Sequence, residues 1–159
     1  MKTKKYRWLF LLLILWAIFI VAFSAQPWSE SFHTSSIVED FILKMVSWMP
    51  GGQDFVKQLL EIFPVRKIAH FVEYMILGGL SAASWVLYQA EEQGNRKPFF
   101  LIAWGSCVLF AVLDELHQAF VPGRTSSIRD VLLDSVGALF GAFLVAWIVK
   151  HVIKNDKEV

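Results

Sequence analysis

The sequence predicts an all-α integral membrane protein with four transmembrane helices and one or two short amphipathic helices on the outer side. Of its 159 residues, 56% are hydrophobic and only 18% are charged, which is too apolar a balance for a soluble domain of this length. Apolar segments occur at about 8–25, 65–88, 98–120 and 128–150, and a spanning helix needs about 20 residues. We interpret residues 1–159 as a single membrane domain.

Charge and cysteine content exclude several other classes of protein. The net charge is +1, and no basic patch is interleaved with aromatic residues, so nucleic acid is not expected as a partner. The lone cysteine, Cys107, cannot form an internal disulfide, and within an apolar run it is expected to pack as a small hydrophobic residue.

The first apolar segment, Trp8–Phe23, follows a positively charged start. This pattern also describes a signal peptide, for which Ala22-Phe23-Ser24 would be an acceptable cleavage site. We favour an uncleaved helix because the segment is long, is rich in aromatic residues and is followed by further apolar segments.

The outer region, residues 27–64, contains two amphipathic stretches. Apolar residues recur at helical spacing from Val38 to Met49 and, after Gly51-Gly52, from Phe55 to Phe63. Each stretch predicts a short helix, either lying at the membrane surface or covering the outer mouth of the bundle as a lid.

The orientation follows from positive charge in the short loops. Basic residues occur before the first segment, in the Glu91–Lys97 loop around Gly94-Asn95, and in the C-terminal tail. Pro64 and Pro98 suit the starts of the second and third helices. Four spans then place the N-terminus and the C-terminus in the cytoplasm, although Arg124 and Arg129 in the second outer loop oppose the rule.

Ionisable residues interrupt three of the four segments, and this topology brings them to the same outer end. Charged groups at bilayer depth are costly and normally mark a functional site. The residues that share a helix face are, in the second segment, Lys67, His70, Glu73 and Tyr74; in the third, Asp114, His117 and Gln118, with Glu115 to the side; and in the fourth, Ser127, Asp130, Asp134, Gly137 and Gly141.

Carboxylates beside histidines are suited to general acid–base catalysis. The candidate catalytic residues are His70, Glu73, Asp114, Glu115, His117 and Asp130. The same residues could instead bind a divalent cation through mixed nitrogen and oxygen ligands, although no recognised metal motif is present. A third interpretation is that they form buried ion pairs that hold the helices in register.

The loop Val121–Ser127 adds groups that suit an anion. Arg124, hydroxyl groups and the free N–H groups of a helix that begins after Ser127 could hold a phosphate or carboxylate. Alternatively, Arg124 pairs with Glu115 or Asp130 in a tight turn. The candidate substrate-binding residues are Lys67, Tyr74, Gln118, Arg124, Ser127 and Asp134.

Four ordered motifs resemble those of the VanZ-like family of small bacterial multi-pass membrane proteins. They are Lys67-x-x-His70-Phe71-x-Glu73-Tyr74, Asp114-Glu115-x-His117-Gln118, Pro122-Gly123-Arg124 and Asp130-x-x-x-Asp134-x-x-Gly137-x-x-x-Gly141. The resemblance covers about half of the chain, from Arg66 to Gly141, and implies a helical fold in the bacterial cell membrane. The family takes its name from an accessory protein of glycopeptide-antibiotic resistance that favours resistance to teicoplanin. Many relatives are expected to have Asn where this chain has Asp134.

We therefore expect an enzyme at the outer leaflet that acts on a lipid or a lipid-linked cell-envelope precursor. In it, His117 or His70 would transfer protons, Asp114 or Glu73 would orient the histidine, and Arg124 would bind an anionic head group. The alternative is a non-enzymatic protein that binds such a head group or precursor. A proton- or ion-coupled transporter is a third hypothesis, for which four spans are few.

Overall fold

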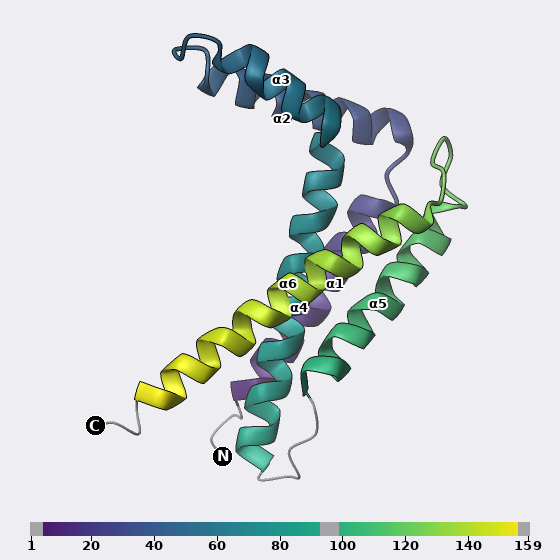
Figure 1. Cartoon of the computed structure of the whole chain (residues 1–159). Coiled ribbons are helices and arrows are strands. Elements are labelled where there is room, and N and C mark those ends of the chain that lie inside the picture. Colours follow the sequence, from purple (N-terminus) through teal and green to yellow (C-terminus); the bar gives the residue numbers. More distant parts are fainter. Residues whose placement is uncertain (1–4, 93–98, 156–159) are drawn as a thin grey trace.

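A computed structural model of the chain describes residues 5–92 and 99–155, and within these ranges the regular structure is entirely helical. The helices are α1 (Lys5–Ser24), α2 (Trp28–Met45), α3 (Gly52–Ile62), α4 (Val65–Glu92), α5 (Phe99–Gln118) and α6 (Ile128–Asn155) (Figure 1). The loop expected at Gly94-Asn95 and the helix start expected at Pro98 lie outside the described residues.

Four of these helices, α1, α4, α5 and α6, are long and apolar enough to cross a membrane. They correspond to the four apolar segments of the sequence, and together with the all-helical fold they confirm the predicted fold class. Large apolar side chains such as Leu109, Phe140 and Trp147 lie on the outside of the bundle, more than half exposed. This distribution suits a protein whose spans are surrounded by lipid.

Among the described helices, α4 and α6 pack against each other most extensively. A Cβ atom added at Gly141 would overlap the Met75 carbonyl oxygen, and one added at Gly137 would reach the Phe71 carbonyl oxygen. Gly78 of α4 is equally close to the backbone of Ala138 in α6. Glycines on both helices therefore let the two backbones approach until they touch, as small residues do in membrane helix pairs.

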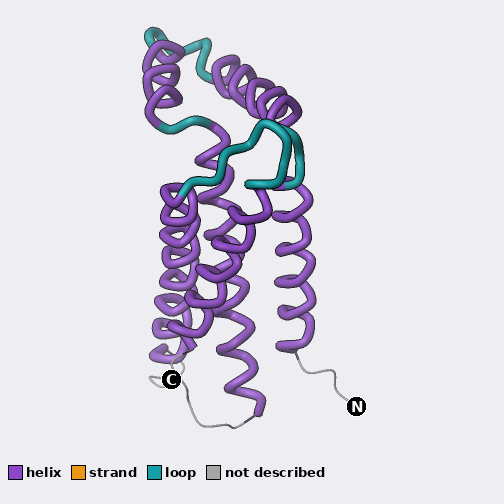
Figure 2. The backbone as a smooth tube through the Cα atoms, turned by 90° about the vertical axis from the view of Figure 1, so that its right-hand side faces the viewer, coloured by secondary structure: helices purple, strands orange, loops and turns teal. Residues whose placement is uncertain are grey.

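Residues 27–64 form a helical hairpin of α2 and α3 that lies across one end of the bundle (Figures 1 and 2). Both predicted amphipathic helices are present, but α2 begins at Trp28, well before Val38. The turn between them uses Gly51 at a φ of 74°, a left-handed conformation that costs glycine little. Many apolar side chains of the hairpin are exposed, Phe41 and Ile62 among them.

The start of α1 and the end of α6 lie at the opposite end of the bundle from this hairpin (Figure 2). The start of α4, the end of α5 and the start of α6 all lie at the hairpin end. Those three helix ends carry the ionisable residues singled out in the sequence, so the fold gathers them at one end.

Candidate functional site

The side-chain amide of Gln118 at the end of α5 lies at the centre of this polar end. Its Oε1 atom accepts hydrogen bonds from Arg66 Nη2 at 3.2 Å and from Arg124 Nη1 at 3.0 Å. Its Nε2 atom donates to Asp114 Oδ2 at 3.0 Å. One neutral side chain, 1% exposed, thus separates two arginines from a buried carboxylate.

The remaining contacts of Arg124 are with backbone carbonyl groups at the end of α1. Its Nε donates to the Gln26 oxygen at 2.9 Å, and its Nη2 donates to the Phe23 oxygen at 3.2 Å. Within residues 5–92 and 99–155, no carboxylate lies within 4.0 Å of the charged nitrogens of Arg124 or Arg66. The alternative in which Arg124 pairs with Glu115 or Asp130 is therefore not found, because Arg124 donates to neutral oxygens instead.

Burial is the main influence on the Arg124 guanidinium and lowers its pKa from the ordinary value. The nearby positive charge of Arg66 lowers this pKa further, whereas the carboxylates of Asp114, Glu115 and Glu73 raise it. The Arg66 guanidinium also lies over the face of the Trp28 ring, with its central carbon 5.1 Å from the ring centre. Two arginines, one of them only 8% exposed, are thus held side by side.

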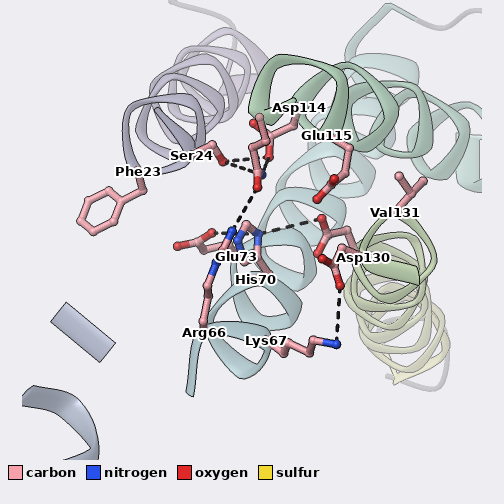
Figure 3. Close-up of polar contacts among 12 residues, drawn as sticks. Phe23, Ser24, Arg66, Lys67, His70, Glu73, Asp114, Glu115, Asp130 and Val131 are labelled. Atoms are coloured by element: carbon pink, nitrogen blue, oxygen red, sulfur yellow. Dashed lines mark hydrogen bonds and ion pairs between the residues drawn. The ribbon is translucent and has the colours of Figure 1, made fainter. Parts of the chain in front are cut away.

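Asp114 is the buried carboxylate on the other side of Gln118, 3% exposed. Besides the Gln118 amide, its Oδ2 atom accepts a hydrogen bond from Ser24 Oγ at 2.8 Å. Ser24 is the last residue of α1, so the first helix contributes directly to the polar end. Figure 3 shows these two residues facing each other across the α1–α5 boundary.

His70 of α4 lies between two carboxylates. Its Nδ1 atom is 4.0 Å from Glu73 Oε2 and 4.0 Å from Asp134 Oδ2, beyond hydrogen-bond distance in each case. Asp134 is 1% exposed. This arrangement lets either carboxylate orient the imidazole after a small rotation, and it is a geometry in which histidine can carry a proton.

Two further pairs connect the helix ends. Lys67 Nζ lies 3.7 Å from Asp130 Oδ1, linking α4 to α6 near the surface (Figure 3). Glu115, 3% exposed, accepts a hydrogen bond from the Ser127 N–H at 2.9 Å. Ser127 Oγ in turn accepts from the Arg129 N–H at 3.2 Å, so Ser127 caps the N-terminus of α6 as expected.

A cavity of about 220 Å³ opens beside these groups, and we call it the arginine cavity. Its wall from α4 carries Arg66, His70 and Glu73, and Arg124 closes one side. The opposite wall is α2, which contributes the hydroxyl groups of Ser31, Thr34 and Ser35. The arrangement offers two guanidinium groups, an imidazole and several hydroxyls to a ligand small enough to fit.

The predicted site residues fall into three positions. His70, Glu73 and Arg124 line the arginine cavity. The buried residues Tyr74, Asp114, Glu115, Gln118 and Asp134 do not line it, and neither do Lys67, which is exposed, or Ser127 and Asp130, which are half-buried. His117 is exposed and does not line the cavity, because the buried face of α5 carries Ala111, Asp114 and Gln118 instead. A catalytic role for His117 stays a prediction.

The described part of the chain contains no group of three or more His, Cys, Asp or Glu side chains that could hold a metal ion. The candidate ligands are divided between the His70 side and the Glu115 side of the helix ends.

Three contributions to the site were not predicted from the sequence. Arg66 directly precedes the first motif residue. It lies one helical turn before His70 and two turns before Glu73, so its place on the same helix face was a signal in the sequence that could have identified it. Ser24 and the α2 hydroxyls had no such signal, since their positions depend on how α1 and α2 pack on α4 and α5.

Comparison with known proteins gives one match. A family model described as VanZ/LLP1 matches residues 9–150. No curated protein matches the chain significantly, and no solved structure does.

Proposed function

This chain belongs to the VanZ/LLP1 family, and we propose that it binds the phosphate-bearing head group of a lipid or lipid-linked cell-envelope molecule at the outer leaflet of the bacterial cell membrane. The observation that carries this proposal is the pair of arginines in the wall of the arginine cavity. Arg66 and Arg124 share one neutral acceptor, Gln118 Oε1, and no carboxylate of the described residues lies within 4.0 Å of either charge.

A buried and a half-buried positive charge side by side, Arg124 and Arg66, favour an anion that can accept from both. Guanidinium groups match the oxygens of a phosphate through paired hydrogen bonds, and an unpaired charge in a dry site is costly. The carboxylate that lines the cavity is that of Glu73, which lies 4.0 Å from His70 and forms no ion pair with either arginine. A phosphate group between Arg66 and Arg124 would therefore complete the charge balance of the cavity.

The first test compares lipid binding by the purified protein and an Arg66→Gln variant. We expect the variant to retain several-fold less phospholipid, relative to a diacylglycerol with the same chains, because one of the two phosphate donors is lost. Arg66 is half-buried and makes no ion pair among the described residues, so the fold is expected to persist. The readout is native mass spectrometry of the protein released from micelles of defined lipid composition.

Arg129→Gln is the matched control, since Arg129 is an exposed arginine at the same end of the molecule and does not line the cavity. It should retain phospholipid as the unmodified protein does. Equal retention by all three proteins, with no preference for phosphate over diacylglycerol, would contradict the proposal.

Acid–base catalysis on the bound molecule is the second candidate function, favoured by the placement of His70. Its imidazole lies on the cavity wall between Glu73 and Asp134, where it could move a proton to or from a head group held by the arginines. Asp114, Glu115 and Asp130 would then act indirectly, by holding the helix ends that position His70.

The second test is the envelope-lipid profile of cells that express His70→Gln. If the protein is an enzyme, this variant should abolish the change in lipid or precursor composition that the unmodified protein causes, yet retain bound phospholipid. If His70 alone moves the proton, His117→Gln should retain the activity, because His117 does not line the cavity. Loss of the activity in His117→Gln would instead support the catalytic role that the sequence predicts for His117. Susceptibility to teicoplanin is a further readout, since we propose that the altered or shielded envelope molecule reduces glycopeptide action. A His70→Gln protein with full effect would leave binding alone as the function.

A further inference from the structure

The arginine cavity carries hydrogen-bond acceptors on two opposite walls. On the α4 wall, the Glu73 carboxylate lies 4.0 Å from His70 Nδ1 and accepts no hydrogen bond among the described residues, since Trp16 Nε1 donates to the backbone carbonyl of Glu73 instead. On the α2 wall, the hydroxyl-bearing residues Thr34 and Ser35 line the cavity. The oxygens of a phosphodiester are themselves acceptors, so a bound phosphate alone satisfies neither wall.

The α2 hydroxyls act as acceptors because the helix already uses their hydrogens. Thr34 Oγ1 donates to the Glu30 carbonyl oxygen at 3.0 Å, and Ser35 Oγ donates to the Ser31 carbonyl oxygen at 2.9 Å. Each hydroxyl oxygen keeps its lone pairs for a ligand. The Ser31 hydroxyl, on the same wall, makes no hydrogen bond among the described residues and can donate or accept. The α2 wall therefore suits a ligand that brings hydrogen-bond donors.

The cavity also has room for more than a phosphate. Its volume is about 220 Å³, whereas a cavity of about 150 Å³ holds a molecule of the size of benzene. A phosphate between Arg66 and Arg124 thus leaves space for a group of a few further heavy atoms. Because the arginines and both sets of acceptors line this one cavity, a single small head group can contact all of them.

We propose that this head group is a phosphodiester of a small polyol such as glycerol, whose hydroxyl groups donate to Glu73 on one wall and to Thr34 and Ser35 on the other. This inference rests on the proposed function and adds to it the class of head group. Each hydroxyl of a polyol is a separate donor. Hydroxyls on neighbouring carbons point in different directions, so one polyol can serve acceptors on opposite walls.

Other head groups fit this arrangement less well. An ammonium group could pair with Glu73, but it is a single centre and the α2 acceptors lie on the opposite wall. It would also bring a further positive charge into a cavity that already holds the guanidinium groups of Arg66 and Arg124, and like charges repel. An alkyl head group would leave the carboxylate and the hydroxyls without donors, which costs free energy.

The test measures retention of four lipids with identical acyl chains by the full-length protein, using native mass spectrometry. Phosphatidylglycerol carries the polyol, and phosphatidylpropanol has the same charge and carbon skeleton without the hydroxyls. Phosphatidylethanolamine carries an ammonium group, and diacylglycerol lacks the phosphate. We expect phosphatidylglycerol to be retained several-fold better than phosphatidylpropanol or phosphatidylethanolamine, because one neutral hydrogen bond contributes about two- to ten-fold.

The double variant Thr34→Val, Ser35→Ala removes both α2 acceptors. Its fold is expected to persist, since Thr34 is exposed and Ser35 is half-buried. It should lower the preference for phosphatidylglycerol over phosphatidylpropanol several-fold and leave the retention of phosphatidylpropanol over diacylglycerol unchanged, because both arginines remain. Thr125→Val, Ser36→Ala is the matched control, since neither residue lines the arginine cavity, and it should keep the full preference.

The outcomes separate the two proposals. Equal retention of phosphatidylglycerol and phosphatidylpropanol, both above diacylglycerol, would overturn the polyol site and leave the phosphate site standing. A preference for phosphatidylethanolamine would overturn it as well, and so would a preference for phosphatidylglycerol that the double variant keeps in full. No preference for any phospholipid over diacylglycerol would overturn the proposed function itself. If the double variant fails to fold, Thr34→Val alone should weaken the preference by about two- to ten-fold.

Discussion

At the residue scale, the polar end of this protein is organised by neutral side chains placed between charges. Gln118 accepts from two arginines with its oxygen and donates to Asp114 with its nitrogen. Ser24 adds a second donor to the same Asp114 oxygen. Because a buried charge is tolerated only when it is hydrogen-bonded or paired, Gln118 and Ser24 stabilise the buried Asp114 carboxylate, and Gln118 supplies one of the acceptors of each arginine.

We predict that Gln118→Leu lowers the free energy of unfolding by about 2–5 kcal/mol, since it leaves buried charges without their partners. His117→Leu is the control on the same helix turn. His117 is exposed, so its replacement should change stability by no more than about 0.5 kcal/mol. Reversible unfolding in mixed micelles measures both. Equal stability of the two variants would show that Gln118 does not bridge these charges.

At the element scale, the closeness of α4 and α6 sets the positions of the side chains that face each other across them. Carbonyl oxygens of α4 lie directly against Gly137 and Gly141 of α6. The same approach brings Lys67 to Asp130 and His70 to Asp134. The stripe that lets the helices pack is therefore continuous with the stripe that carries the carboxylates, and one cannot shift without the other.

We predict that Gly141→Ala destabilises the protein by about 1–3 kcal/mol, because the added methyl group forces the two backbones apart. Gly105→Ala is the control on the exposed surface of α5, since an added Cβ there meets nothing within 4 Å. It should be neutral or slightly stabilising. The separation of α4 from α6 should also weaken lipid retention in Gly141→Ala. A stable Gly141→Ala protein with full retention would contradict this account of the packing.

At the scale of the whole molecule, the four candidate spans and the α2–α3 hairpin determine which helix ends meet. With four crossings, the start of α4, the end of α5 and the start of α6 lie at one end. The α2–α3 hairpin lies over that end (Figure 2), and α2 supplies one wall of the arginine cavity. Its exposed apolar side chains suit a helix pair that lies at the membrane surface.

We predict that a reporter fused after Gly123 reads as extracytoplasmic and one fused after Gly94 reads as cytoplasmic. The reason is the excess of basic residues in the N-terminal segment, the loop around Gly94 and the C-terminal tail. A fusion after Gly51, in the hairpin, should agree with the one at Gly123. A cytoplasmic signal at Gly123 would place the arginine cavity at the inner leaflet and reverse the proposed source of its ligand.

The sequence by itself determined the fold class, the approximate bounds of all four spans and the gathering of the ionisable residues at one end. These three features depend on residues close together in the chain, because hydropathy identifies the spans and helical periodicity identifies the face on which each polar residue lies. The N-cap at Ser127 was predictable for the same reason, since a cap depends on residues within one turn.

Only the tertiary structure decided which residues of each polar face are buried and what they contact. On α5 the spacing grouped His117 with Asp114 and Gln118, yet the packing of neighbouring helices buries the latter two and leaves His117 exposed. Arg124 reaches the end of α1, 98 positions away, rather than the neighbouring carboxylates. Such contacts join segments that are distant in sequence, and no periodicity within a single helix specifies them, because they depend on how the helices rotate and cross when they pack.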